Sequence, residues 1–299
     1  MSRFRLAARP LLATLALAAG CVRHSAMDEH DHGDMSASAP SAATSPASIA
    51  AGAGDVAARL MASPRHQEWV YIHTGADSIR AYVVYPERAT KAPVVVVIHE
   101  IFGLSGWVRG VADQLAADGY IAIAPDLLTG MGTRQGDTLT WNDARGLIGS
   151  LKQDDIHRQL AAIGKYGMSL PAAQQKYGIV GFCWGGSNSF AHAVRSPEGL
   201  GAAVVYYGTS PSRAELERVR VPVLGLYGGN DARVDATIPP ADSAMKQLGK
   251  VYEPHVFAGA GHGFLRAQTD TGATGAANRQ AALQAWPLTI GWFRRYLGR

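Results

Sequence analysis

The chain contains only two cysteines among its 299 residues, Cys21 and Cys183. If Cys21 is removed or modified near the N-terminus, Cys183 has no partner, which excludes an intramolecular disulfide. The chain also lacks a dense run of basic residues with interleaved aromatics. Its net charge of +4 comes from scattered residues, so nucleic-acid binding gets little support. The 47% hydrophobic content instead favours a globular protein with one large domain.

Residues 1–21 have the features of an export signal. Three arginines precede an apolar stretch that is too short to span a bilayer comfortably. The end of that stretch, LALAAGC, resembles the lipobox of bacterial lipoproteins, whose cysteine is acylated and becomes the mature N-terminus. On this interpretation Cys21 carries lipid and attaches the exported protein to a membrane of the periplasm or cell envelope. The alternative is ordinary signal cleavage near Ala16 or Ala18, without lipid.

Residues 22–58 are rich in Ala, Ser, Gly, Asp and His and contain almost no large apolar side chain. We therefore expect a disordered tether. Within it, His24, His30 and His32 stand close to several carboxylates, so metal capture is chemically feasible, but without a folded frame a solvated linker is the favoured interpretation. A metal-handling role would predict that deletion of the tether abolishes function. We expect neither a metal nor an organic cofactor.

Short apolar strands alternate with helical segments over residues 59–299, which we predict to form a single catalytic domain. The segments EWVYIHT and RAYVVYP flank the polar turn GADS like a hairpin, and APVVVVIHE suits a strand buried on both faces of a parallel sheet. Further strands are expected in YIAIAPDLL, KYGIVGF, GAAVVYYG and VPVLGLYGG, and helices over 107–117, 143–165, 187–194 and 280–297. This alternation predicts an α/β fold with a mostly parallel central sheet flanked by helices. Reactive groups should gather beyond the carboxyl ends of its strands.

One of these strands leads into GFCWGG, which has the form G-x-C-x-G around Cys183. This is the spacing of a nucleophile elbow, a strained strand-to-helix turn in which Gly181 and Gly185 leave room beside the nucleophile. The N-terminus of the following helix would favour a thiolate and an oxyanion, with the Trp184 N–H as a candidate donor. The alternative is that Cys183 is a buried and inert small residue.

Two later strands are followed by an acid and a histidine. LYGGNDARV places Asp231 just beyond one strand, and FAGAGHGF places His262 just beyond the next. A histidine can shuttle a proton while a carboxylate fixes its tautomer. Alternatively, Asp231 caps a turn and His262 lies in a Gly-rich loop by chance. The order of nucleophile, acid and histidine along the chain favours a catalytic triad.

Glu100 ends the run VVVIHE, on a strand expected to lie beside the elbow strand. The Ile101 N–H is then the second candidate donor of an oxyanion hole. A structural salt bridge is the alternative explanation for the carboxylate at this position.

The segments HEIFGL, GFCWGG, GGNDARV and AGHGF, in this order, resemble the dienelactone hydrolase family of α/β-hydrolases, from about Glu68 to the C-terminus. The resemblance implies an α/β-hydrolase fold in which Cys183 is the nucleophile, His262 the general base and acid, and Asp231 its orienting partner. It also implies an oxyanion hole made by the backbone N–H groups of the residues that follow Glu100 and Cys183.

For Glu100 the resemblance implies contact with the neutral thiol at rest and help in its deprotonation when substrate enters. Family members that hydrolyse dienelactone hold the substrate carboxylate with two arginines. Arg266 matches one of these positions, but Gly130 stands at the other, which puts dienelactone itself in doubt. Tyr206 and Tyr207 resemble an aromatic pair at the rim of the family's active site and are expected to line the substrate pocket. Core packing is an equally good explanation for one of them.

These features predict an exported hydrolase, a monomer or small homo-oligomer, that acts on a small-molecule ester or lactone. It would form an acyl-cysteine and release it with water. Amides suit this chemistry less, because a thiolate leaves a tetrahedral intermediate more readily than an unprotonated amine does. The alternative is a non-enzymatic lipoprotein that uses the same fold to bind a ligand or partner.

Overall fold

The computed structural model describes residues 56–75, 77–131 and 141–298, so the export signal, Cys21 and residues 22–55 of the predicted tether lie outside the described part of the chain. The strands are β1 (Gln67–His73), β2 (Ser78–Val84), β3 (Ala92–Ile98), β4 (Ile121–Pro125), β5 (Ala173–Phe182), β6 (Leu200–Tyr206), β7 (Val223–Gly228) and β8 (Tyr252–Phe257). The helices are α1 (Val56–Ala62), α2 (Gly106–Ala117), α3 (Trp141–Ser150), α4 (Gln153–Ser169), α5 (Trp184–Arg195), α6 (Arg213–Leu216), α7 (Ala232–Asp235), α8 (Ile238–Gln247) and α9 (Gly275–Leu297), with a 3₁₀ turn, η1 (Arg266–Thr269).

The strands form one sheet in the order β1-β2-β4-β3-β5-β6-β7-β8. β1 pairs with β2, and β2 with β4, in antiparallel fashion, while the other neighbours pair in parallel. The predicted hairpin and the predicted mostly parallel sheet are therefore confirmed. Because parallel strands end at the same edge, the loops after β3, β5, β7 and β8 meet at one edge of the sheet.

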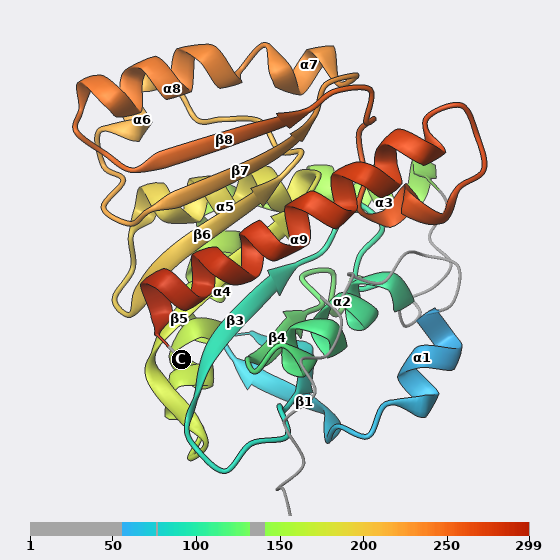
Figure 1. Cartoon of the computed structure of the whole chain (residues 1–299). Helices are drawn as coiled ribbons and strands as arrows, with labels where there is room; N and C mark the ends of the chain where they lie inside the picture. The colour runs from blue at the N-terminus through green and yellow to red at the C-terminus, as the bar shows by residue number, and fades with distance from the viewer. Residues whose placement is uncertain (1–55, 76, 132–140, 299) are drawn as a thin grey trace, which may run out of the picture. The chain divides into compact units, whose positions relative to one another are not determined.

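The two faces of the sheet bury two separate hydrophobic clusters. Residues of β3 are buried throughout, and successive valines of the strand point to opposite faces: Val95 and Val97 belong to one cluster, Val94 and Val96 to the other. Helices α2 and α9 pack on the first face, and α4, α5 and α8 on the second. Figure 1 shows α9 crossing one face of the sheet diagonally. This two-sided burial explains why β3 is a continuous apolar run.

The helices differ from the sequence expectation in their bounds. The amphipathic segment predicted over 143–165 is two helices, α3 and α4, separated at Leu151 and Lys152. The Ser150 hydroxyl donates to the Leu147 carbonyl at the end of α3, and two aspartates in the first turn of α4 favour a new helix N-terminus there. The helices predicted from residues 187 and 280 begin earlier, at Trp184 and Gly275.

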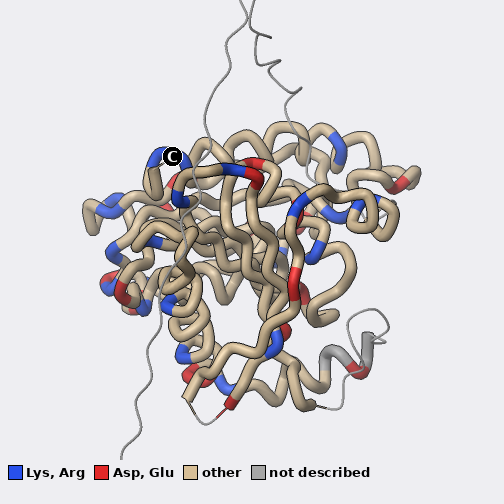
Figure 2. Tube along the Cα trace, turned by 90° about the horizontal axis from the view of Figure 1, so that it is seen from below, with Lys and Arg blue, Asp and Glu red and all other residues tan. Residues whose placement is uncertain are grey.

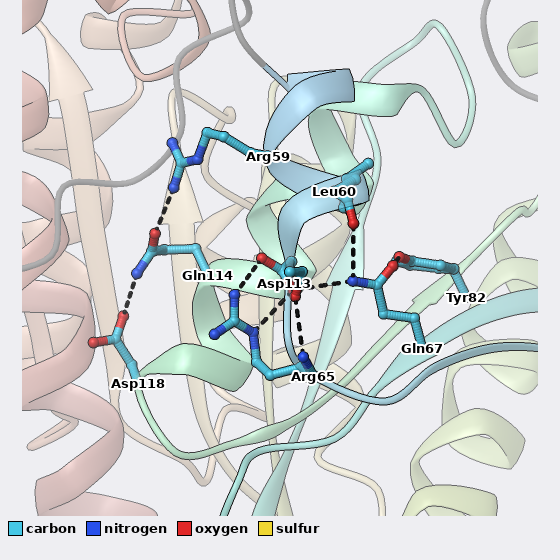
Figure 3. Close-up of polar contacts among 9 residues, drawn as sticks. Arg59, Leu60, Arg65, Gln67, Tyr82, Asp113, Gln114 and Asp118 are labelled. Carbon is cyan, nitrogen blue, oxygen red and sulfur yellow. Dashed lines mark hydrogen bonds and ion pairs between the residues drawn. The ribbon is translucent and has the colours of Figure 1, made fainter.

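Helix α1 extends the folded unit toward the N-terminus. It begins at Val56, inside the segment that the sequence assigns to the tether, and Val56 is buried in the cluster that includes α2. Figure 3 shows the polar contacts that hold it: Arg59 donates to Gln114 Oε1 at 2.8 Å, and Arg65 Nη2 pairs with Asp113 Oδ2 at 2.7 Å. The folded unit therefore begins before the hairpin.

Charged residues of both signs are interspersed along the described trace (Figure 2). Among the described helices, none has both the length and the apolar character needed to cross a bilayer.

Candidate active site

The turn from β5 to α5 holds Cys183 in a strained backbone conformation. Its φ and ψ are 57° and −116°, and a positive φ is rare for residues other than glycine. A Cβ added to Gly181 would lie 1.9 Å from the Gly185 carbonyl oxygen, and one added to Gly185 would lie 2.4 Å from the His99 carbonyl oxygen. The turn therefore requires glycine on both sides of Cys183, which is the geometry of a nucleophile elbow.

The loops after β7 and β8 bring Asp231 and His262 into contact. Asp231 immediately precedes α7, and its Oδ2 accepts a hydrogen bond from Nδ1 of His262. Because an ionised carboxylate only accepts, Nδ1 carries the proton, and Nε2 is the nitrogen that exchanges one. The Asp231 side chain is 9% exposed and the imidazole 35% exposed, so the carboxylate is shielded while the ring reaches solvent. This pair can act as a base with a fixed tautomer.

The Cys183 thiol is neutral at pH 7. Burial, followed by the negative charge of Glu100, raises the pKa of this thiol to about 11. The Trp184 N–H and the positive charge of Arg233 act in the opposite direction and are outweighed. The helix N-terminus thus favours the thiolate, as expected, but desolvation and the neighbouring carboxylate outweigh it, in keeping with the neutral resting thiol that the family resemblance implies.

Glu100 and Arg266 form a shielded ion pair beside the thiol. Nε of Arg266 lies 2.9 Å from Oε2 of Glu100, a contact that has the distance of an ion pair but not the alignment of a hydrogen bond. The Glu100 side chain is only 4% exposed, whereas the Arg266 side chain is 39% exposed and lies near the Phe102 ring. Burial raises the pKa of Glu100, and the charges of Arg266 and His262 oppose that rise. The predicted substrate ligand Arg266 is thus engaged by Glu100.

Tyr206 ends β6 and Tyr207 follows it, and the two side chains lie in different environments. Tyr206 is fully buried, and its hydroxyl hydrogen-bonds to Thr289 of α9 at 2.7 Å, so it belongs to the core rather than to a substrate pocket. Tyr207 is also fully buried, but its ring lies 5.2 Å from the His262 ring. Its φ is 39°, and its hydroxyl has no hydrogen-bond partner among the described residues. Of the pair, only Tyr207 contacts the site.

The two predicted oxyanion donors come from adjacent backbone segments. Register pairs Ile98 of β3 with Gly181 of β5, so the loop that begins at His99 lies against the elbow. Ile101 directly follows Glu100 and lies in a turn. Trp184 begins α5, and its N–H is directed at the Cys183 sulfur. Two backbone N–H groups directed at one point can stabilise an oxyanion, and this stays the predicted role of Ile101 and Trp184.

Two further residues lie at this site. Both stand within the segments HEIFGL and GGNDARV, but the sequence assigned neither of them a role. Arg233, in α7, contributes a positive charge that reaches the thiol. His99 is fully buried between the Glu100 carbonyl and the Leu127 N–H. Within the described ranges, no cluster of three or more His, Cys, Asp or Glu side chains has the arrangement of a metal site.

The sheet order, the elbow and the hydrogen-bonded acid and histidine after β7 and β8 define an α/β-hydrolase. Comparisons with known proteins identify the family within this class. The model of the family described as "Dienelactone hydrolase family" matches residues 79–297, and the chain belongs to this family.

Individual relatives cover most of the chain. A Salmonella typhimurium protein named "Putative carboxymethylenebutenolidase" is 29% identical over 244 residues, which is 76% of this chain and 87% of the relative. A Saccharolobus solfataricus protein of the same name is 30% identical over 263 residues, 76% of this chain and 97% of the relative. The crystal structure of a "Putative Dienelactone Hydrolase" from Klebsiella pneumoniae matches with a TM-score of 0.68 and 27% identity, over 78% of this chain and 99% of that one.

Replacing Gly181 with Ala is expected to destabilise the elbow, because the new Cβ would overlap the Gly185 carbonyl oxygen. Overpacking costs typically about 1–3 kcal/mol, and here the obstacle is backbone, so we expect at least the upper end. Gly291→Ala in α9 is the matched control, since its Cβ would meet no atom within 4 Å. Thermal unfolding of the two variants measures the difference. Equal melting temperatures would contradict the close approach at Gly181.

Replacing Glu100 with Gln is expected to lower the pKa of the Cys183 thiol from its value of about 11, because a negative charge that opposes the thiolate is removed. At a fixed pH below that value, each unit of pKa decrease raises the thiolate fraction about tenfold, and alkylation by iodoacetamide accelerates with it. The pH profile of alkylation, followed by intact mass, measures the shift. Glu253→Gln, which alters an exposed carboxyl on β8, should leave the profile unchanged. Superimposable profiles for Glu100→Gln and the parent protein would show that this carboxylate does not act on the sulfur.

Proposed function

We propose that the protein hydrolyses small carboxylic esters or lactones through an acyl intermediate on Cys183. The observation that carries this proposal is the elbow placing a free cysteine at the sheet edge where Asp231 and His262 are hydrogen-bonded to each other. Membership of the dienelactone hydrolase family supports the same reaction class. The relatives named carboxymethylenebutenolidase support a lactone among the substrates.

In the first half of the reaction, His262 Nε2 accepts the Cys183 Sγ proton, and the sulfur attacks the carbonyl carbon. The carbonyl oxygen becomes an oxyanion that accepts hydrogen bonds from the Ile101 and Trp184 N–H groups. The C–O bond to the leaving group then breaks, and the leaving oxygen takes the proton from His262. The product is a thioester on Cys183 together with an alcohol, which stays attached to the acyl group when the substrate is a lactone.

In the second half, His262 accepts a proton from water, and the resulting hydroxide attacks the thioester carbonyl. The same two backbone donors hold the second oxyanion. The C–S bond breaks, the carboxylic acid leaves, and the sulfur regains its proton from the imidazolium. Asp231 accepts a hydrogen bond from the Nδ1–H group throughout, so it stabilises the imidazolium in both halves.

Glu100 assists the first proton transfer. The charges of Glu100 and His262 act on each other, so the carboxylate stabilises the imidazolium that forms when the thiol is deprotonated. Arg266 favours the ionised form of this carboxylate and so opposes the burial that raises its pKa. A substrate that carries an anionic group would draw the half-exposed guanidinium toward itself and make Glu100 the stronger base.

The substrate we propose differs from dienelactone. The resemblance provides for two carboxylate-binding arginines, and this chain has Arg266 but Gly130 at the second position. Gly130 has a φ of 80°, and no atom of the described residues lies within 4 Å of where its Cβ would be. A small ester or lactone held by one arginine fits this arrangement.

A panel of p-nitrophenyl esters and lactones tests the reaction class. We expect turnover, with an acyl adduct on Cys183 that is visible by intact mass and disappears as product forms. Cys183→Ala is expected to lose turnover, and His262→Asn to lose roughly 10²–10⁴-fold in kcat, the usual size of a general-base contribution. Cys21→Ser is the matched control, because it removes the other cysteine and none of the described site.

The contrary result would be ester turnover by Cys183→Ala at the parental rate, which would remove the acyl-cysteine mechanism. Absence of both adduct and turnover across the panel would instead favour a non-enzymatic lipoprotein that binds a ligand through the same fold.

We propose in addition that the chain is exported and anchored through lipid on Cys21, in the periplasm or cell envelope. The basic start, the short apolar stretch and LALAAGC support this placement. Metabolic labelling with a fatty acid in a bacterial host should label the parent protein and not Cys21→Ser, with the parent in the membrane fraction. Equal labelling of both proteins, or none, would contradict lipidation.

A further inference from the structure

His99 lies fully buried between the loop after β3 and the loop after β4. Its Nδ1 lies 2.6 Å from the carbonyl oxygen of Glu100, and its Nε2 lies 3.3 Å from the backbone N of Leu127. A carbonyl only accepts and an N–H only donates, so Nδ1 carries a proton and Nε2 does not. The two contacts therefore define a single neutral tautomer. Burial agrees with this state, because it lowers the pKa of the His99 imidazole.

The carbonyl that His99 holds belongs to the same peptide group as the Ile101 N–H. In a trans peptide the C=O and N–H bonds lie in one plane and point in opposite directions, so fixing the oxygen fixes the direction of the hydrogen. The chain contains no cis peptide bond among the described residues. A hydrogen bond to the carbonyl also polarises the peptide and strengthens its N–H as a donor. The Gly103 N–H also donates to this carbonyl, at the longer distance of 3.3 Å, so His99 supplies the shorter of its two hydrogen bonds and shares in setting the aim and strength of the first proposed oxyanion donor.

The same imidazole contacts the second donor segment. Its ring is stacked on the Trp184 ring, with centroids 5.4 Å apart and an interplanar angle of 17°. The His99 carbonyl oxygen also lies where a Cβ on Gly185 would be, at 2.4 Å. The backbone of the loop and the backbone of the elbow are therefore in close contact. One buried side chain touches both segments that carry the proposed oxyanion donors.

We propose that His99 is a positioning residue that orients the oxyanion hole, through its hydrogen bond to the Glu100–Ile101 peptide and its stacking on Trp184. The proposal rests on the function proposed above, in which the Ile101 and Trp184 N–H groups receive the oxyanion. His99 does not touch the reacting atoms. Substitution of His99 should therefore slow only those steps that pass through an oxyanion. A general structural role would instead slow every reaction of the Cys183 sulfur.

Three substitutions of His99 each retain a different one of its contacts. In Asn the amide nitrogen is bonded to Cγ, as Nδ1 is in His, so His99→Asn keeps a donor for the Glu100 carbonyl. In Gln the amide lies one bond further out, near the place of Nε2, so His99→Gln keeps an acceptor for the Leu127 N–H. His99→Phe keeps a ring to stack on Trp184 and loses both hydrogen bonds.

Two reactions of the same sulfur provide the readouts. Hydrolysis of p-nitrophenyl acetate passes through an oxyanion, whereas alkylation of Cys183 by iodoacetamide displaces iodide and forms none. We expect kcat for the ester to fall about 10–100-fold in His99→Phe, somewhat less than the effect of deleting a donor, with KM and the alkylation rate within about threefold of the parent. His99→Asn should recover most of kcat, and His99→Gln should recover less.

Several results would overturn the proposal. Parental kcat in all three variants would do so, as would a parallel loss of hydrolysis and alkylation, because that pattern indicates general distortion of the elbow. Equal kcat for His99→Asn and His99→Gln would also do so, and this comparison remains decisive if His99→Phe does not fold. The activity of Cys183→Ala distinguishes a failure of the proposed function from a failure of the proposed role of His99. Turnover by Cys183→Ala would refute the proposed function, whereas its inactivity together with unaffected His99 variants would refute the role of His99 alone.

Discussion

The close approach of three backbone segments at the β5–α5 turn is the constraint on which the rest of the site depends. A Cβ at Gly181 or Gly185 would collide with the turn itself or with the His99 carbonyl, and one at Gly186 would lie 2.4 Å from the Tyr206 carbonyl oxygen. The turn, the loop after β3 and the end of β6 therefore meet without side chains between them. This contact accompanies the positive φ of Cys183, and the Trp184 N–H acts on its sulfur.

Electrostatics at the site disfavour ionisation of the Cys183 thiol. The helix N-terminus and Arg233 favour a thiolate, but desolvation and the charge of Glu100 outweigh them. Burial raises the pKa of Glu100, and the charge of Arg266 opposes that rise. A neutral thiol resists oxidation better than a thiolate, which matters for an unpaired cysteine if the protein is exported. In the proposed mechanism, the carboxylate that disfavours the thiolate also supports the imidazolium of His262, so activation of the thiol would involve both groups.

Much of the fold and the centre of the site could be predicted from the sequence because the relevant signals are local. β-branched runs, a hairpin turn and the Gly-x-Cys-x-Gly spacing report on neighbouring residues, and the sheet and its hairpin are as expected. Helix bounds were less predictable. The division between α3 and α4 depends on an aspartate-rich first turn and a serine end that interrupt one continuous amphipathic pattern.

The sequence by itself determined which residues follow the strand ends, and therefore that Cys183, Asp231 and His262 would be presented at one edge of the sheet. Tertiary structure decided what each of the neighbouring groups does. It paired Arg266 with Glu100, and it separated Tyr207 at the site from Tyr206 in the core. The physical reason is distance along the chain: these contacts join segments that only the packed sheet brings together, and no local pattern encodes which side chain will meet which.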